Sequence, residues 1–243
     1  MQVIKLSATD STSAWMRRMM ADGEVADLTV VWALEQTAGR GQPGRSWQAE
    51  RGKNLTFSLL KKFEGLSASE HFLLNMAVSR AVYQVLEALS VPDLRVKWPN
   101  DILSGRHKLG GILIENHLQG MHLVHSIIGI GLNVNQEDFT GVPGAASLLG
   151  VTGRAYELEP LFESLCQSVA AALGKLPQSS FEAERTAYEA LLFRKDRPAT
   201  FSGPDGATFP GIIRGISREG LLVVEVEKGI TQTFDFRAVR MHY

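Results

Sequence analysis

A short basic segment with three glycines, followed by a strand and not by a helix, constrains the fold of this chain most. Residues 37–47 read Thr-Ala-Gly-Arg-Gly-Gln-Pro-Gly-Arg-Ser-Trp. The spacing of Gly39, Gly41 and Gly44 matches the dinucleotide fingerprint and approaches the P-loop, but both motifs need a helix to begin at the last glycine. Residues 54–60 follow instead, and they are rich in β-forming side chains. The sequence therefore argues against both folds and predicts a loop between two strands.

The same segment has the composition of an anion-binding loop. Arg40 and Arg45 place permanently charged donors beside bare glycine backbone, a pairing that suits carboxylates and phosphates. Trp47 follows and could stack on a base. Protein kinases also carry a glycine-rich loop between strands, but their His-Arg-Asp and Asp-Phe-Gly motifs do not occur here. For the loop alone, a surface hairpin with incidental arginines is an equally good interpretation.

Length, charge and cysteine content are those of an ordinary globular chain. The 243 residues suffice for one sizeable core plus a small appendage. A formal net charge of −1 gives no broad footprint for DNA or an anionic membrane, and no apolar run approaches the ~18 residues of a membrane span. The single cysteine, Cys166, suits a reducing compartment. We therefore expect a cytoplasmic protein that binds neither DNA nor membranes.

Hydrophobic periodicity predicts a mixture of strands and helices in which no repeat is evident. The expected strands are 3–6, 29–35, 55–61, 94–96, 109–116 and 123–134, and the expected helices are 12–21, 67–90, 156–174 and 179–193. After residue 195 the pattern changes to short strands with frequent turn signals, which predicts a small SH3-like β-barrel. We expect a larger domain over residues 1–193 and a C-terminal β domain over residues 194–243.

Three further segments contain residue types that are common in binding sites. Residues 97–101 read Lys-Trp-Pro-Asn-Asp and place the last two at a strand end, although an Asn-Asp turn is the simpler account. Lys108 precedes two glycines, so its ammonium can approach a ligand. Gly129 and Gly131 lie within a strand, where close approach of a ligand and a β-bulge explain them equally well. With one cysteine and no His-Glu-x-x-His motif, we expect no zinc site.

In their joint order these segments resemble the biotin protein ligases. The resemblance spans about residues 9–135 and rests on Asp10-Ser-Thr-Ser13, Gln36, Gly39-Arg-Gly through Trp47, Lys97-Trp-Pro-Asn-Asp101, Lys108-Leu-Gly-Gly-Ile-Leu-Ile-Glu115 and Gly129-Ile-Gly-Leu-Asn133. Enzymes of this family join biotin to ATP as biotinyl-5′-adenylate, with Mg²⁺, and then pass the biotinyl group to one lysine of an acceptor protein. The resemblance implies an α+β catalytic domain of the class II aminoacyl-tRNA synthetase/biotin ligase type, a mixed sheet flanked by helices.

The resemblance also implies a role for each matching residue. Biotin is expected to contact Ser11, Thr12, Gln36, Gly39, Arg40, Gly41, Lys108, Gly129 and Gly131, with the first three on its ring and Lys108 on its carboxylate. The nucleotide is expected to contact Arg45, Trp47, Lys97, Asn100 and Asn133, with Trp47 against adenine and Lys97 near the phosphates. The expected catalytic residues are Arg40, Lys108 and Asp101, of which the carboxylate would orient or deprotonate the acceptor lysine. No residue is expected to ligate a metal directly.

The chain departs from the family pattern at several positions. Gln42 stands where some members have arginine, Ser13 stands where asparagine is frequent, and Pro43 is expected to stiffen the loop. Only nine residues precede Asp10, which predicts a monofunctional enzyme without the helix-turn-helix domain of the family's repressors. The expected acceptor is a biotin carboxyl carrier domain of a carboxylase, and the expected state is a monomer or homodimer. A lipoate ligase and a non-catalytic biotin-binding module remain alternatives.

Overall fold

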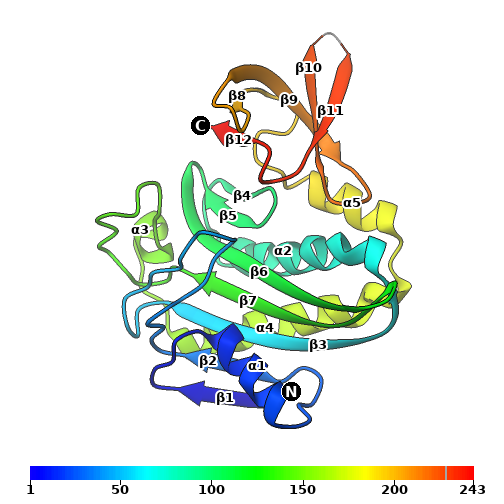
Figure 1. Ribbon diagram of the computed structural model, residues 1–243. Coiled ribbons are helices and arrows are strands. Elements are labelled where there is room, and N and C mark those ends of the chain that lie inside the picture. Colours follow the sequence, from blue (N-terminus) through cyan, green and yellow to red (C-terminus); the bar gives the residue numbers. More distant parts are fainter. Residues whose placement is uncertain (228) are drawn as a thin grey trace.

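The computed structural model describes residues 1–227 and 229–243, which form a large mixed sheet and a smaller antiparallel sheet (Figure 1). In the larger sheet the strand order is β1-β2-β3-β7-β6-β5-β4, and only the β1–β2 pair is parallel. Its strands are β1 (Val3–Leu6), β2 (Val30–Ala33), β3 (Leu55–Ser67), β4 (Leu94–Lys97), β5 (Asp101–Ser104), β6 (His107–Gln119) and β7 (His122–Leu132). The mixed sheet of the expected α+β fold is confirmed.

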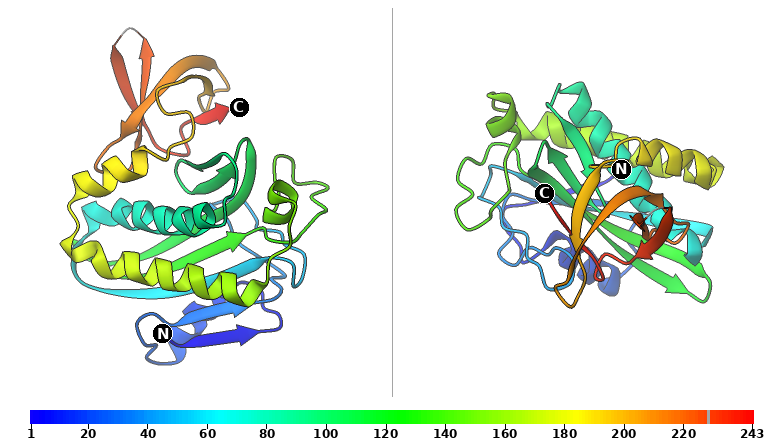
Figure 2. Two further views of the ribbon diagram at one scale, coloured as in Figure 1. Left: turned by 180° about the vertical axis from the view of Figure 1, so that it is seen from behind. Right: turned by 90° about the horizontal axis from the view of Figure 1, so that it is seen from above.

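Helices flank this sheet on both faces. They are α1 (Thr12–Asp22), α2 (His71–Ala88), α3 (Leu148–Thr152), α4 (Leu158–Lys175) and α5 (Phe181–Glu189), with 3₁₀ turns η1 (Ala68–Glu70) and η2 (Leu176–Gln178). The long helices α2 and α4 lie together over one face of the sheet, as the view from behind shows (Figure 2). The short helix α1 packs on strands β2, β3 and β7 on the other face. No described helix is long and apolar enough to cross a membrane.

The two faces of the sheet bury different side chains because successive residues of a strand point to opposite sides. Toward α4, Trp32 stacks on Phe162 with ring centroids 4.4 Å apart, and Phe57 meets the same ring edge-on at 5.3 Å. Toward α1, Leu60 and Ile127 join a second apolar cluster. Further along this second face the positions on β3 and β7 become small or polar. The helix therefore covers only part of its face and leaves room for a cavity beside it.

The smaller sheet consists of β8 (Pro198–Ser202), β9 (Thr208–Ile216), β10 (Leu222–Glu227), β11 (Ile230–Phe234) and β12 (Arg240–His242). These strands form an antiparallel sheet in the order β11-β10-β9-β8-β12. The expectation of an SH3-like barrel is refined here, because in the described residues no ladder joins the edge strands β11 and β12. The turn between β9 and β10 contacts Trp98, which follows β4 of the larger sheet and whose Nε1 donates to the carbonyl of Gly220 at 2.9 Å.

Several element boundaries differ from those that the sequence predicts. Strand β3 continues to Ser67, beyond the predicted end at residue 61, because its polar second half pairs with the start of β7. The predicted helix 67–90 opens with the turn η1, and α2 itself spans His71–Ala88. The predicted helix 179–193 is shorter, Phe181–Glu189. The short elements β5 and α3 were not predicted, because four or five residues carry too little periodicity.

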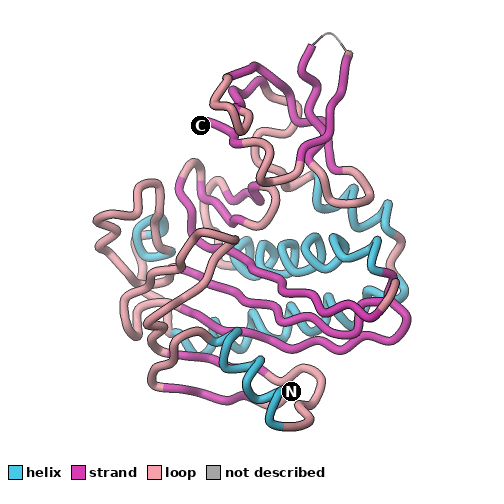
Figure 3. The backbone as a smooth tube through the Cα atoms, in the orientation of Figure 1, coloured by secondary structure: helices cyan, strands magenta, loops and turns pink. Residues whose placement is uncertain are grey.

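Loops gather at one end of the large sheet (Figure 3). They include the segment after β2, the turn between β4 and β5, and the segment between β7 and α3. These loops leave their strands at the same end of the sheet, so they lie beside the small and polar residues of β3 and β7. This end of the sheet holds the candidate site.

Candidate active site

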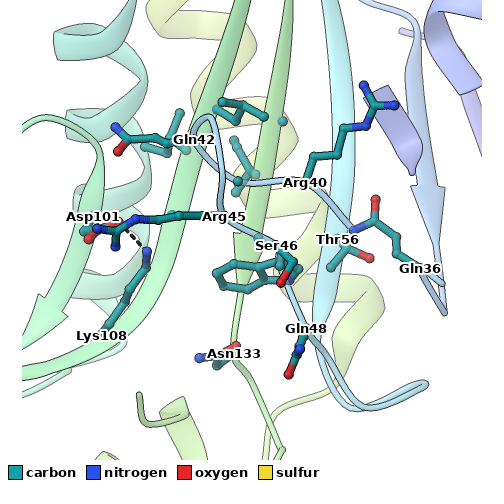
Figure 4. A pocket seen from close by; sticks show the side chains of 18 of the residues that line it. Gln36, Arg40, Gln42, Arg45, Ser46, Gln48, Thr56, Asp101, Lys108 and Asn133 are labelled. Carbon is teal, nitrogen blue, oxygen red and sulfur yellow. Dashed lines mark ion pairs between the residues drawn. The ribbon is translucent and has the colours of Figure 1, made fainter. Parts of the chain in front are cut away.

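A cavity of about 280 Å³ opens between the N-terminus of α1, the glycine-rich loop and the ends of β5, β6 and β7. Gln36 lies at one end of it, and the Asp101–Lys108 pair lies at the other, with the loop passing between them (Figure 4). Polar side chains thus mark both ends, while Gly129 and Gly131 form part of the wall. This shape suits an elongated ligand that has a polar group at each end.

The glycine-rich loop is an ordered hairpin. Trp47 donates its N–H to the carbonyl of Gly39 at 2.9 Å, and Arg45 donates to the carbonyl of Gln42 at 2.8 Å. Pro43 and Gly44 occupy the middle of the turn, and the φ of +79° at Gly44 is the conformation that a type II turn requires at that position. Pro43 therefore lies at the tip of the hairpin, and its stiffening effect stays a prediction.

Gly39 is needed for the hairpin to close. A Cβ atom at this position would clash with the backbone oxygen of Trp47 and lie 3.0 Å from Gln36 Nε2. The glycine thus lets the two sides of the hairpin approach one another, and it lets the loop approach Gln36. The hairpin places Arg40 and Arg45 at the cavity with exposed side chains.

Gln36 and the start of α1 form the first polar end. The backbone N–H and the hydroxyl of Thr12 both donate to Gln36 Oε1, at 2.8 and 3.1 Å. Ser11 is the N-cap residue of α1, but its hydroxyl makes no capping hydrogen bond. The Thr12 N–H is satisfied by Gln36 instead, which leaves the Ser11 hydroxyl at the cavity wall.

Lys108 and Asp101 form the second polar end. Lys108 Nζ lies 2.5 Å from Asp101 Oδ1, and the two side chains are 35% and 19% exposed. The ammonium is also 6.0 Å from the centroid of the Trp47 ring. The backbone of Lys108 is held on both sides, because its N–H donates to Gly144 and its carbonyl accepts from Ala146. The cavity thus contains a positioned cation whose partner is a single carboxylate.

The two strand glycines serve close approach and not a bulge. Both pair regularly with β3 and β6, with no register shift at either position, so the β-bulge interpretation is wrong. A Cβ at Gly131 would lie 2.5 Å from Trp47 Cε2, so the indole occupies the space that a side chain would need. A Cβ at Gly129 would lie 3.3 Å from Ser13 Oγ. Gly131 thus leaves space for the Trp47 indole, and Gly129 leaves space in the cavity.

Two asparagines of the site hold its loops together. Asn100 Nδ2 donates to the carbonyl of Ile112 at 2.6 Å, and its Oδ1 accepts from Gln42 Nε2 at 3.2 Å. Buried Asn133 donates to the carbonyl of Ala146 at 3.0 Å. Gln42 thus ties the tip of the hairpin to the turn after β4, a contact that arginine at this position would not make with the same geometry.

Most of the predicted site residues line this one cavity: Ser11, Thr12, Gln36, Arg40, Gly41, Arg45, Trp47, Asn100, Asp101, Lys108, Gly129, Gly131 and Asn133. Gly39 lies behind the wall. Lys97 borders an adjacent cavity of about 380 Å³ between the larger and the smaller sheet, and this cavity shares Gln42, Arg45, Asn100 and Asp101 with the first. Its ammonium lies 4.7 Å from the centroid of the Tyr243 ring. The individual roles of these residues remain predictions.

Sequence reasoning assigned no role to residues 139–145, four of which line the cavity: Phe139, Val142, Pro143 and Ala145. The segment carries only turn signals, and it reaches the site because Ala145 pairs with Lys108 in an isolated bridge. Sequence reasoning also gave no role to Ser58, a fully buried hydroxyl on β3 beneath the cavity wall. The sequence feature that could have indicated a role for Ser58 is its place as a single serine within the apolar part of β3.

Comparison with known proteins agrees with this geometry. The sequence profile of the Biotin/lipoate A/B protein ligase family matches residues 6–133. The chain belongs to this family. A biotin--[acetyl-CoA-carboxylase] ligase from Paracoccus denitrificans is 32% identical over 233 residues, which cover 92% of this chain and 94% of the relative. The bifunctional ligase/repressor BirA of Escherichia coli is 29% identical over 225 residues, which cover 92% of this chain and 69% of that protein.

The fold comparison leads to the same group of ligases. A biotin protein ligase from Aquifex aeolicus in complex with biotin and ATP superposes with a TM-score of 0.80 and 25% sequence identity. The superposition covers 99% of this chain and 98% of the other. The family ligases thus share the arrangement of both sheets and not only the segment that the profile matches.

Proposed function

We propose that this protein is an ATP-dependent ligase that activates biotin as biotinyl-5′-AMP and transfers the biotinyl group to a lysine of a biotin carboxyl carrier domain. The observation that carries this proposal is the cavity with Gln36 and Thr12 at one end and Lys108 at the other. Biotin has a cyclic urea at one end and a carboxylate at the other, and the polar groups of the cavity match that order. The likeness to the Paracoccus ligase over nearly its whole length supports the same activity.

The biotin ring would bind at the Gln36 end. Ser11, Thr12 and Gln36 supply hydroxyl and amide groups there, and Gly129 leaves room for the ring. Gly39 and Gly41 let the hairpin pass close to the ligand. The biotin carboxylate would reach Lys108, whose ammonium is held ready by one carboxylate only.

The nucleotide would bind beside the biotin carboxylate. Trp47 lies against Gly131 and lines the cavity, where its indole could stack on adenine. Arg45, Asn100 and Asn133 lie around the same space. The phosphates would extend toward Lys97 in the adjacent cavity, which shares Arg45 with the first. The two cavities together give room for ATP and biotin at once.

Magnesium enters this reaction as part of the substrate MgATP. Among the residues that the structure describes there is no group of three or more His, Cys, Asp or Glu side chains that could hold a metal ion. The cavity itself contains one carboxylate, Asp101, which is already paired. This donor set fits an ion bound mainly by phosphate oxygens and water, as is usual for Mg²⁺ with nucleotides.

In the first step a carboxylate oxygen of biotin attacks the α-phosphorus of ATP. A new O–P bond forms, the bond to the β-phosphate oxygen breaks, and pyrophosphate leaves. Two anions must approach each other, so the barrier is mainly electrostatic. Lys108 neutralises the attacking carboxylate, and Arg40, on the hairpin above, is the second cation for the developing charge. Exclusion of water by the bound substrates and the hairpin would protect the mixed anhydride from hydrolysis.

In the second step the amine of the acceptor lysine attacks the biotinyl carbonyl carbon. A C–N bond forms, the C–O bond to the phosphate breaks, and AMP leaves. The amine must first lose a proton, which costs roughly 4–5 kcal/mol at pH 7 for an unperturbed lysine. Asp101 would orient this amine or accept its proton, because the biotin carboxylate displaces it from Lys108 in the first step.

The acceptor would be the biotin carrier domain of a carboxylase, as the names of the relatives indicate. We also propose that the chain works as a monomer or homodimer without binding DNA. The formal net charge of −1 supports the last point, since phosphate contacts to a duplex require an excess of basic side chains.

Isotope exchange between pyrophosphate and ATP, dependent on biotin and Mg²⁺, tests the proposal. Exchange with biotin and not with lipoate is the expected result. Exchange with lipoate alone would reassign the cavity to a lipoate ligase, and folded protein that supports neither reaction would be a binding module. Transfer is then measured with a purified carrier domain, in which replacement of the single acceptor lysine should abolish labelling.

A further inference from the structure

Three buried hydroxyl groups form a hydrogen-bonded chain behind the Gln36 end of the cavity. Thr12 Oγ1 lies 2.8 Å from Ser58 Oγ, and Ser13 Oγ lies 3.0 Å from Ser58 Oγ. The exposed fractions of Thr12, Ser13 and Ser58 are 3%, 4% and 0%. Thr12 and Ser13 line the cavity, whereas Ser58 lies beneath them and does not. We call these three groups the hydroxyl chain.

The direction of every proton in the hydroxyl chain follows from its end at Gln36. A backbone N–H can only donate, so the Gln36 atom that faces the N–H of Thr12 is the carbonyl oxygen Oε1. The Thr12 hydroxyl lies 3.1 Å from the same oxygen and must therefore donate to it. With its single proton used, Thr12 can only accept from Ser58. Ser58 has then used its own proton and can only accept from Ser13.

This order decides what the cavity offers to a ligand. All three hydroxyl protons are committed within the hydroxyl chain, so Thr12 and Ser13 face the cavity as hydrogen-bond acceptors. Gln36 has its oxygen committed to Thr12, so its Nε2 faces the ligand as a donor. The wall beside Gly129 thus offers two hydrogen-bond acceptors, Thr12 and Ser13, and one donor, Gln36 Nε2. A ligand ring that carries both N–H and C=O groups can satisfy all of them.

We propose that Ser58 is a positioning residue that makes this wall selective for the cyclic urea of biotin without touching it. The inference rests on the proposed function and adds a specificity device to it. Ser58 acts by taking the proton of Ser13 and giving its own to Thr12. The dithiolane ring of lipoate has neither N–H nor C=O groups, so it would leave these buried polar atoms without partners, which costs binding energy.

The variant Ser58→Ala removes the middle of the hydroxyl chain. Thr12 then lacks its donor, and the proton of Ser13 is free to turn toward the cavity, where it opposes an N–H of the ligand. We expect the dissociation constant of biotin, measured by calorimetry, to rise about 5- to 20-fold. The kcat at saturating biotin should stay within about twofold, because the reacting carboxylate is bound at the other end of the cavity.

A matched control separates this effect from a loss of packing. Ser126 is also fully buried, lies on β7, and donates to Asn116 Oδ1 at 2.6 Å, away from the cavity. Ser126→Ala removes one buried hydroxyl and its hydrogen bond, and the dissociation constant of biotin should stay within twofold. Thermal unfolding of both variants records the structural cost. If Ser58→Ala does not fold, Ser58→Cys keeps the side-chain volume with a much weaker donor and should weaken biotin in the same direction.

A biotin analogue methylated at a ureido nitrogen tests whether Ser58 acts through the ligand's N–H groups. The ratio of the affinities for biotin and for this analogue would not change if Ser58 had only a structural role. The unmodified protein should lose at least tenfold in affinity for this analogue relative to biotin, and that ratio should shrink in Ser58→Ala. Equal effects of Ser58→Ala and Ser126→Ala, or an unchanged ratio, would overturn the role of Ser58. No binding of biotin by the unmodified protein would overturn the proposed function itself, so the two failures are distinguishable.

Discussion

Asp101 Oδ1 and Lys108 Nζ form an ion pair 2.5 Å long inside the cavity. The two residues lie on neighbouring strands, β5 and β6, where Asp101 pairs with Gly111 and Lys108 pairs with Leu103. A substrate carboxylate that binds Lys108 competes with the Asp101 carboxylate for this ammonium. Displacement of Asp101 by biotin would leave its oxygens available to the acceptor amine only after biotin is bound, which would couple the two steps of the proposed reaction.

The variant Asp101→Asn should separate the two steps. It keeps the shape of the side chain and frees Lys108, so biotin-dependent pyrophosphate exchange should persist with an equal or lower KM for biotin. Transfer to the carrier lysine should slow by about 10²–10⁴-fold, the usual contribution of a positioned base. Single-turnover transfer from preformed adenylate measures the second step alone, and an unchanged transfer rate would contradict the role of Asp101.

Asp27 offers a matched control for this variant. Its carboxylate lies 2.5 Å from Lys61 Nζ, the same distance as in the cavity pair, but outside the two cavities that contain the predicted site residues. Asp27→Asn should leave both steps unchanged. If it slowed transfer as much as Asp101→Asn, loss of an ion pair alone would explain the effect.

The two strand glycines should fail in different ways when replaced by alanine. At Gly131 the added methyl would meet the Trp47 ring at 2.5 Å, so the indole must move and the KM for ATP should rise about tenfold or more. At Gly129 the methyl would meet the Ser13 hydroxyl at 3.3 Å and narrow the ring end, which should raise the KM for biotin instead. Steady-state exchange with each substrate varied separately distinguishes the two effects.

Gly174 is the control for these substitutions. It lies in helix α4 with open space around it, so Gly174→Ala should leave both KM values unchanged and stabilise the fold by about 0.5–1 kcal/mol. Identical kinetic defects in the Gly131 and Gly129 variants would show that the substitutions act through the sheet and not through separate subsites.

Much of the fold could be predicted because long elements carry a clear periodicity. Helix α2 and the β6–β7 hairpin are long enough for their apolar positions to fix both the type of element and the buried face. Strand β5 is different. Its four residues form a strand because β4 and β6 provide hydrogen-bonding partners on either side, and no pattern within four residues contains that information.

The site shows the same division between local and tertiary information. Residues of the hairpin and of the Lys97–Asp101 segment could be picked out because glycine, proline and charged side chains stand close together in the sequence. The segment 139–145 could not, since it reaches the cavity only through its pairing with Lys108. Ser58 was hidden for a related reason, because a buried hydroxyl has a role only once its partners, 45 and 46 residues away, are known.

The single cysteine should be inert in the native protein. Burial is the main factor that raises the pKa of the Cys166 thiol to about 12, and the charge of Glu163 adds to it. The reactive thiolate is therefore scarce at neutral pH, and the side chain is fully buried in α4. Iodoacetamide should label the protein only in denaturant, and treatment under native conditions should leave pyrophosphate exchange unchanged. Rapid native labelling with loss of exchange would contradict this.

The pair of Asp10 and Arg18 should make the start of α1 sensitive to acid. Two guanidinium hydrogen bonds from Arg18, at 2.8 and 2.9 Å, hold the pKa of Asp10 well below its usual value of 3.8, and the N–H of Ser11 and hydroxyl of Thr9 add to the effect. A lowered pKa in the folded state contributes stability above pH 4 that is lost as the pH falls further. Because the Asp10 side chain is 44% exposed, solvent screens the pair, and we expect about 0.5 kcal/mol.

The variant Asp10→Asn isolates this charge, because the amide oxygen can still accept the hydrogen bond from Ser11. Urea unfolding at pH 6 should show the variant to be slightly less stable than the unmodified protein. The difference should begin to shrink as the pH falls below 3.8, where the unfolded chain loses the Asp10 charge, and it should vanish only when the carboxyl is protonated in the folded protein as well. The affinity for biotin should fall over the same range, since Asp10 holds the backbone from which Ser11 reaches the cavity. A stability difference that stays constant with pH would assign the effect to the hydrogen bonds and not to the charge.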